Sequence, residues 1–260
     1  MIATPPPALH FSTPDGMRHA YYELGGGESG PPIIMQHGFS ATTWHEWVQC
    51  GISDKMATLG RRVIGLDAMG HGQSTRSHDP KDYGEGRMAK DVSALIDLLG
   101  VSRFDYLGYS MGGVIGLQIG ISEQQRLRRL VIAGIGEGVI VQGGVDTRVL
   151  SRGVLAQGLR ADDVSGFPPL VQAFRGGIEM MGNDRLALAA HADSYQHAVT
   201  GLDRIGAPTL LIAGDTDPLA IHPERLAAAI PDCKLVIVPG DHVQARLVPE
   251  FAAAAMEFLR

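Results

Sequence analysis

Short β-like runs alternate with segments of helical periodicity along most of this 260-residue chain. Parallel strands need long crossover connections, which are usually helices, so strands separated by helices predict a parallel sheet with helices on both faces. The runs that we interpret as strands are Tyr21–Leu24, Ile33–Gln36, Arg62–Leu66, Phe104–Tyr109, Leu130–Ala133, Thr209–Ala213 and Lys234–Val238.

The segments between these runs have the spacing of amphipathic helices. Apolar residues recur at the 3.6-residue period from Met88 to Leu99, and Gly100 is placed to end that helix. Further helices are predicted from Met111 to Ile121 and after Pro223 and Pro249. In open parallel sheets, ligands bind at the carboxyl ends of the strands. Functional residues are therefore expected just after each strand.

One long segment interrupts this alternation. Residues 136–199 are rich in glycine and contain no clear β-run, and a helix near Asn183 leads back to the regular pattern. We interpret the segment as a small, mostly helical insertion. The predicted organisation is therefore a core formed by residues 1–135 and 200–260, with residues 136–199 as a cap.

Composition and charge exclude several classes of protein. The net charge is −6, and basic residues form no run longer than a pair, which argues against nucleic-acid and membrane partners. Cys50 and Cys233 lie far apart in the sequence and are expected to be free thiols in a reducing compartment. No signal peptide and no apolar run of about 18 residues is present, so we expect a soluble, cytoplasmic protein. The sequence leaves the oligomeric state open.

The strongest chemical signal is Gly108-Tyr109-Ser110-Met111-Gly112-Gly113. It follows a predicted strand and opens a predicted helix, which is the context that a G-x-S-x-G nucleophile turn requires. Side chains at positions 108 and 112 would crowd the tight turn, so both are glycine. The turn would project the Ser110 hydroxyl into a cleft and leave the Met111 N–H at a helix N-terminus, facing a developing oxyanion.

A serine nucleophile needs a base that is oriented by an acid. Two candidate acids, Asp215 and Asp217, follow the Thr209–Ala213 run, and the candidate base His242 follows the Lys234–Val238 run. Both loops lie at carboxyl ends of predicted strands, where they can converge on Ser110. The order nucleophile, acid, base is the one found in α/β-hydrolases.

Together these motifs resemble the α/β-hydrolase superfamily, in its branch of small esterases, lactonases and carbon–carbon hydrolases with a helical cap. The resemblance implies a mostly parallel, eight-stranded sheet and favours Asp217 as the acid, three residues after the strand-ending Gly214. Members usually have glycine before the catalytic histidine, where this chain has Asp241.

Two more segments carry the same resemblance. His37-Gly38-Phe39 is similar to the oxyanion loop, with Phe39 N–H as the second donor beside Met111 and His37 as a structural residue. The segment Asp67–Ser74 matches the D-x-x-G-H-G-x-S turn of the family, which we interpret as architecture beside the site.

Pocket residues are harder to identify. Trp44, Phe174 and Met181 are candidates for substrate contact, although packing explains each of them equally well. His191 and His197 lack the spacing of metal ligands, and the glycines at 134, 136 and 138 do not match a dinucleotide fingerprint. We therefore expect no metal and no cofactor, and a small-molecule substrate.

The sequence predicts a serine hydrolase that cleaves a small carboxylic ester through an acyl-enzyme on Ser110. One alternative uses the same triad as an enol-lactone or carbon–carbon bond hydrolase, or as a perhydrolase. Carbon–carbon hydrolases of this fold usually carry asparagine and tryptophan where this chain has Tyr109 and Val243, which disfavours them. Another alternative is a small-molecule receptor of the same fold with slow turnover.

Overall fold

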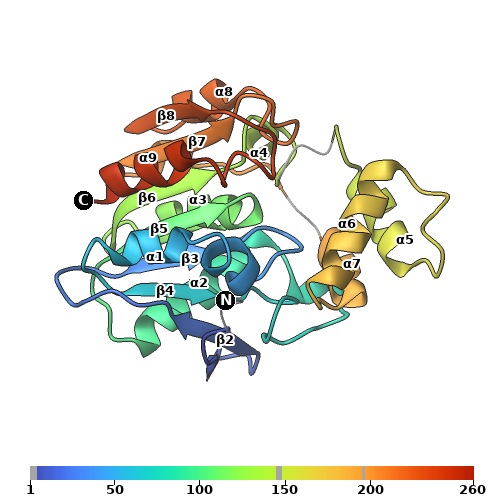
Figure 1. The fold of residues 1–260 in the computed structure, drawn as a ribbon, viewed down its shortest axis with the longest axis horizontal. Coiled ribbons are helices and arrows are strands. Elements are labelled where there is room, and N and C mark those ends of the chain that lie inside the picture. The colour runs from blue at the N-terminus through green and yellow to red at the C-terminus, as the bar shows by residue number, and fades with distance from the viewer. Residues whose placement is uncertain (1–4, 145–147, 195–196) are drawn as a thin grey trace.

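The central feature of the protein is an eight-stranded sheet in the order β1-β2-β4-β3-β5-β6-β7-β8 (Figure 1). It is seen in a computed structural model, which describes residues 5–144, 148–194 and 197–260. The pairs β1–β2 and β2–β4 are antiparallel and the other pairs are parallel, which confirms the predicted fold class. The strands are β1 Leu9–Ser12, β2 Arg18–Glu23, β3 Ile33–Gln36, β4 Val63–Leu66, β5 Phe104–Tyr109, β6 Leu127–Ala133, β7 Thr209–Gly214 and β8 Cys233–Val238.

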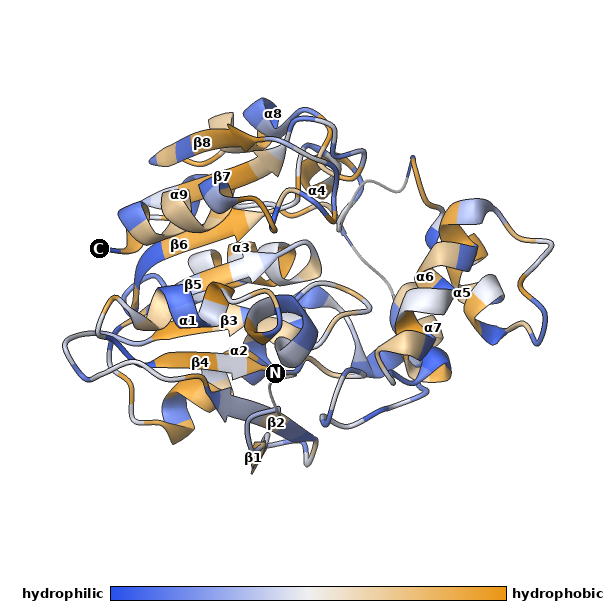
Figure 2. Ribbon diagram, viewed as in Figure 1, coloured by the Kyte–Doolittle hydropathy of each residue, from blue (hydrophilic) through white to orange (hydrophobic). Residues whose placement is uncertain are grey.

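Helices cover both faces of the sheet because successive strand residues point to opposite sides. On β3, Ile34 belongs to the apolar cluster under α2 (Glu85–Leu98), α3 (Met111–Ser122) and α8 (Pro223–Ala228). Its neighbours Ile33 and Met35 belong to the cluster under α1 (Ile52–Ala57) and α9 (Pro249–Leu259). Figure 2 shows β4 and β6 as mainly hydrophobic, and β2, which lies next to the edge strand β1, as more hydrophilic.

Residues at the amino ends of β5 and β6 and just before β4 form a largely buried ionic cluster. Asp105, near the start of β5, is fully buried and accepts hydrogen bonds from Arg61 and Arg128. Both guanidinium groups also donate to the carbonyl oxygen of Leu259, at 2.7 and 3.3 Å respectively. The end of the chain is therefore fixed at the amino ends of these strands.

The segment between β6 and β7 is helical. It contains α4 Gly138–Val141, α5 Arg152–Arg160, α6 Pro169–Met180 and α7 Arg185–Asp193. Helices α5, α6 and α7 bury an apolar cluster of their own and lie to one side of the sheet (Figure 1). Helix α4 differs, because its Val139 packs into a cluster of the sheet. Residues 145–147 and 195–196 of the predicted insertion lie outside the described residues.

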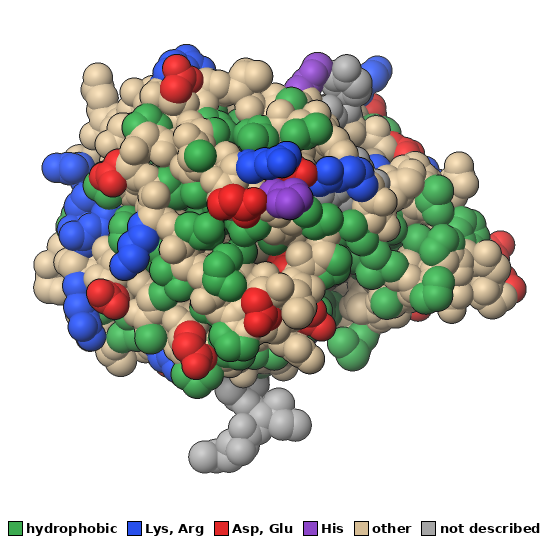
Figure 3. All heavy atoms as spheres, turned by 90° about the horizontal axis from the view of Figure 1, so that it is seen from above, with side chains coloured by type: hydrophobic (Ala, Val, Ile, Leu, Met, Phe, Trp, Pro, Cys, Tyr) green, Lys and Arg blue, Asp and Glu red, His purple; other side chains and the backbone are tan. Residues whose placement is uncertain are grey.

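The surface carries charged side chains of both signs. Figure 3 shows acidic and basic side chains on the same face of the molecule. Among the residues that the structure describes, no helix combines the length and the apolar character that a membrane span requires. Cys50 and Cys233 are both free thiols and partly buried.

Candidate active site

Ser110 lies at the turn between β5 and α3, in a conformation that few non-glycine residues adopt. Its φ is 53° and its ψ is −114°. The turn is tight enough that a Cβ at Gly108 would lie 2.1 Å from the carbonyl oxygen of Gly112. A Cβ at Gly112 would lie 2.1 Å from the carbonyl oxygen of Gln36. Both glycines are therefore required by backbone contacts.

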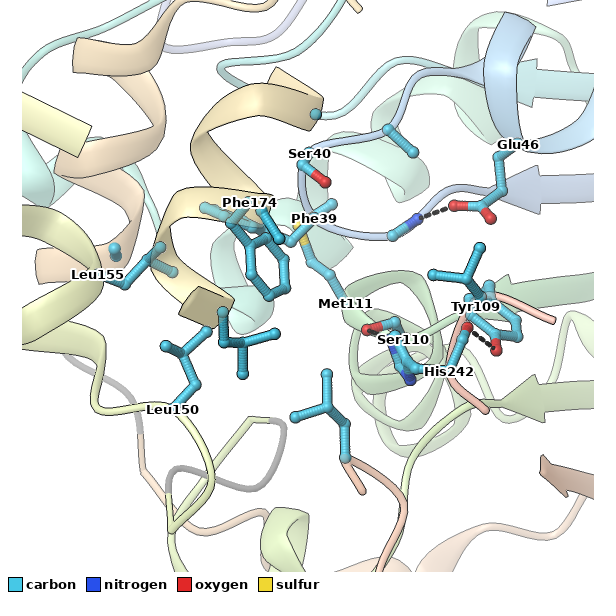
Figure 4. A pocket seen from close by; sticks show the side chains of 18 of the residues that line it. Phe39, Ser40, Glu46, Tyr109, Ser110, Met111, Leu150, Leu155, Phe174 and His242 are labelled. Atoms are coloured by element: carbon cyan, nitrogen blue, oxygen red, sulfur yellow. Dashed lines mark hydrogen bonds between the residues drawn. The ribbon is translucent and has the colours of Figure 1, made fainter. Parts of the chain in front are cut away.

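The imidazole of His242 lies between the hydroxyl of Ser110 (Figure 4) and the carboxylate of Asp217. His242 Nε2 is 3.0 Å from Ser110 Oγ, and His242 Nδ1 is 2.8 Å from the nearer oxygen of Asp217. A carboxylate only accepts hydrogen bonds, so Nδ1 carries the proton and Nε2 is left to accept from the serine. The structure thus brings together the three side chains that the sequence nominates as a triad.

Asp217 and Asp215 have different surroundings. Asp217 is buried, and its Oδ1 also accepts the N–H of Leu219 at 2.8 Å. Asp215 is exposed, and its Oδ1 accepts the N–H of Gly240 at 2.8 Å, which ties the two loops together. Of the two carboxylates, Asp217 is therefore the one that contacts the imidazole.

Side-chain hydrogen bonds from Tyr109 and to Asp241 stabilise the loop that carries His242. Tyr109, the residue before Ser110, donates its hydroxyl to the His242 carbonyl at 2.6 Å. Asp241 accepts the N–H groups of Gln244 and Val243, and these hydrogen bonds lower the pKa of its carboxyl. Asp241, which the family pattern does not predict, thus stabilises the turn that positions the imidazole.

The Gly38–Phe39 peptide is oriented by two buried side chains. His37 Nε2 accepts the N–H of Ala68 at 3.0 Å, so its Nδ1 carries the proton and donates to the Gly38 carbonyl at 2.8 Å. In a trans peptide the N–H points away from the carbonyl, so the Phe39 N–H faces away from His37. Glu46 Oε2 accepts the Gly38 N–H at 3.0 Å.

Glu46 is buried beneath this loop and forms an ion pair with Arg246, which follows the histidine loop. The pair therefore joins the loops that carry Phe39 and His242. Across from Phe39, the Met111 N–H lies at the first residue of α3, where a helix has no internal partner for it. Phe39, Ser110 and Met111 line the same cavity.

A cavity of about 300 Å³ opens from Ser110 and His242 toward the insertion. Figure 4 shows Leu150, Leu155 and Phe174 on its side away from Glu46. Phe174 and Met181 both line it. Trp44, the third predicted contact, lies half-buried on the π-helical turn Trp44–Val48 and is not part of the lining.

Sequence reasoning found Ser110 and His242 but not the other polar residues of this cavity. His191, for which the sequence indicates only that it is not a metal ligand, is buried in α7 and contributes to the lining. Burial, followed by the nearby charge of Arg152, lowers the pKa of His191 well below its usual range, so the ring is neutral. In the described part of the chain, no three His, Cys, Asp or Glu side chains are grouped so that they could hold a metal ion.

Comparisons with known proteins identify the family. A model of the alpha/beta hydrolase fold matches residues 31–159. The structure of a hydrolase from Pseudomonas aeruginosa PA01 is 30% identical, covers 97% of this chain and 98% of its own, and superimposes with a TM-score of 0.74.

Curated relatives have several different names. A dihydrolipoyllysine-residue acetyltransferase component of an acetoin cleaving system from Pseudomonas putida is 27% identical over 98% of this chain and 70% of its own. A putative carbamate hydrolase of Pseudomonas savastanoi pv. phaseolicola is 28% identical over 88% and 93%. For three mycobacterial relatives, 33% identical, the match spans 36% of their length. This chain belongs to the α/β-hydrolase fold family and is an enzyme of the α/β-hydrolase type.

Proposed function

We propose that the protein is a serine hydrolase that cleaves a small carboxylic ester through an acyl-enzyme on Ser110. The observation that carries this proposal is the continuous chain of hydrogen bonds from Asp217 through His242 to Ser110 Oγ, at the edge of a largely apolar cavity. A nucleophile, a base and an acid in hydrogen-bond contact are the groups that acyl transfer requires.

In the first half-reaction, Ser110 Oγ attacks the ester carbonyl carbon while His242 Nε2 takes the hydroxyl proton. The carbonyl oxygen becomes an oxyanion, which the N–H groups of Phe39 and Met111 stabilise. His242 then returns the proton to the leaving alcohol as the carbon–oxygen bond breaks. Asp217 stabilises the imidazolium and keeps its tautomer throughout.

In the second half-reaction, water takes the place of the alcohol. His242 removes a proton from the water, the resulting hydroxide attacks the acyl carbon, and the second oxyanion collapses to release the carboxylic acid. Ser110 recovers its proton from His242, so the enzyme returns to its starting state.

The acyl group is expected to be small and uncharged. Helices α5–α7 of the proposed cap, residues 136–199, contribute Leu155 and Phe174 to the cavity, and Phe174 packs 6.0 Å from Phe39 between ring centroids. A cavity of about 300 Å³ with a mainly apolar lining accommodates a short chain that is uncharged or weakly polar.

A screen of acyl esters of increasing chain length tests the proposal, with Ser110→Ala as the blank. We expect steady turnover and a loss of roughly three or more orders of magnitude in Ser110→Ala. A fluorophosphonate should label Ser110. An active Ser110→Ala protein, or labelling of another serine, would contradict the proposal, whereas release of a single equivalent of product would indicate a receptor.

A further inference from the structure

Asn183 connects the insertion to two loops of the core through one buried carboxamide. Its Oδ1 accepts the N–H of Gly72 at 2.8 Å, and its Nδ2 donates to the carbonyl oxygens of Ser40 at 2.7 Å and Ala41 at 3.3 Å. The partners fix the orientation of the amide, because Gly72 offers a donor and the other two offer acceptors. Asn183 is 8% exposed.

The residue that Asn183 contacts most closely is in a strained conformation. Ser40 has a φ of 68°, in the left-handed region that few non-glycine residues adopt. Such conformations persist where the surroundings hold them. Within the loop, the Ala41 N–H donates to the Gly38 carbonyl at 3.2 Å, and from outside it Asn183 holds the Ser40 carbonyl.

Ser40 directly follows Phe39, whose N–H is a proposed oxyanion donor. A change in the Ser40 backbone would therefore change the direction of that N–H. We infer that Asn183 is a positioning residue. Through its hydrogen bonds, the placement of the insertion on the core determines the direction in which the Phe39 N–H points. This inference rests on the proposed function.

A simpler role would be to anchor α7 to the core. Neighbouring contacts do that without reaching the oxyanion loop. His78 Nε2 lies 3.0 Å from Asp184 Oδ2, and Arg76 donates to the Gly182 carbonyl at 3.4 Å. His78→Ala is therefore a matched control, since it removes a contact of the adjacent residue at the same boundary.

The test variant is Asn183→Asp. A carboxylate can still accept the Gly72 N–H, but it presents an acceptor where the Ser40 and Ala41 carbonyls need a donor. The substrate is 4-nitrophenyl acetate, because an acetyl group is too short to depend on the lining that the insertion provides. We expect kcat to fall by about 10- to 100-fold with a smaller change in KM, since sub-ångström displacement of a catalytic group has effects of this order. His78→Ala should stay within about twofold of the wild type.

Amide hydrogen exchange of residues 37–43 gives a second readout that needs no turnover. Exchange in this segment should become faster in Asn183→Asp and should remain unchanged in His78→Ala. If Asn183→Asp does not fold, Asn183→Ala, which removes the three hydrogen bonds without adding a charge, has the same expected outcome.

Unchanged kcat on the acetate ester, or unchanged exchange of residues 37–43, would overturn the inference and leave Asn183 as an anchor. Failure of the proposed function is a separate result, in which the wild type turns over no ester or Ser110→Ala remains active. In that event the exchange measurement still decides whether Asn183 holds the loop.

Discussion

The loops at the carboxyl ends of the strands and the helices α5–α7 are built in different ways. In the loops, hydrogen bonds fix individual groups, so that Asp217 contacts both His242 and the Leu219 N–H. Helices α5–α7 pack mainly through a shared apolar cluster. They contact the core through ring contacts such as Phe174 with Phe39 and through polar groups at Gly182–Asp184. Hydrogen bonds depend steeply on direction, whereas apolar contacts tolerate changes of shape. Changes to the apolar packing of these helices should therefore affect the choice of substrate more than the chemistry, whereas the polar contacts of Asn183 connect the two.

The largest expected effect concerns the acid of the loops. Asp217→Asn should lower kcat by up to about ten-thousandfold, because an amide at this position favours the wrong tautomer of His242. Asp215→Asn should be mild, since that side chain supports the Gly240 N–H outside the site. Ester turnover of the two purified variants checks the prediction. A larger loss of kcat in Asp215→Asn than in Asp217→Asn would indicate that Asp215 is the acid.

The buried ion pair between two loops should be the next most sensitive. Glu46→Gln leaves the largely buried Arg246 guanidinium without its charged partner, which should cost roughly 3 kcal/mol of unfolding free energy. The matched control is Glu23→Gln, whose partner Arg62 is partly exposed, and a loss below about 1 kcal/mol is expected there. Urea unfolding measures both. Equal losses of unfolding free energy in the two variants would show that burial does not increase the contribution of the Glu46–Arg246 pair to stability.

Two adjacent methionines test how the insertion selects substrates. Met181 lines the cavity, whereas Met180 is 78% exposed. Met181→Ala should shift the acyl chain-length preference by about tenfold, as expected for the loss of apolar pocket volume. Labelling of Ser110 by a small phosphonate should be nearly unchanged. Met180→Ala should alter neither quantity. A Met181→Ala variant that loses stability while its specificity stays the same would assign this side chain to packing alone.

The smallest expected effect lies within α6. Gly176 is in the interior of this helix, and an added Cβ would meet nothing within 4 Å. Gly176→Ala should therefore stabilise the protein by roughly 0.5–1 kcal/mol, since alanine loses less backbone entropy than glycine in a helix. Thermal unfolding measures the gain, and kcat should be unaffected. A destabilised variant would mean that α6 is held in a strained position.

The sheet and the triad candidates could be predicted because their signals are local. Apolar runs and helical periods report the strands and helices, and the glycines around Ser110 report a turn that side chains would obstruct. The sequence of strand β1 contains no such local signal, and this strand was not predicted. It is four residues long, lies at the edge and pairs with β2 alone, so few of its side chains need to be apolar.

The cavity could not be predicted because its residues come from separate segments. His191 and Arg246 meet there through tertiary packing, and no spacing in the sequence relates them. In the sequence, Asn183 lies near the start of a predicted helix. In the structure, Asp184 caps that helix, so the Asn183 carboxamide is available to bind the core loops. The role of Trp44 could not be predicted either, because its position after the oxyanion loop does not reveal which way its side chain points.

The ionic cluster of Asp105, Arg61 and Arg128 also determines how the enzyme could be attached to a solid support. It holds the Leu259 carbonyl at the amino ends of the strands, whereas Ser110 and His242 lie beyond their carboxyl ends. A tether joined after Arg260 would therefore leave the molecule on the side opposite the cavity. Immobilisation through this end should orient every molecule with its cavity toward the solution, whereas random coupling through surface lysines would not.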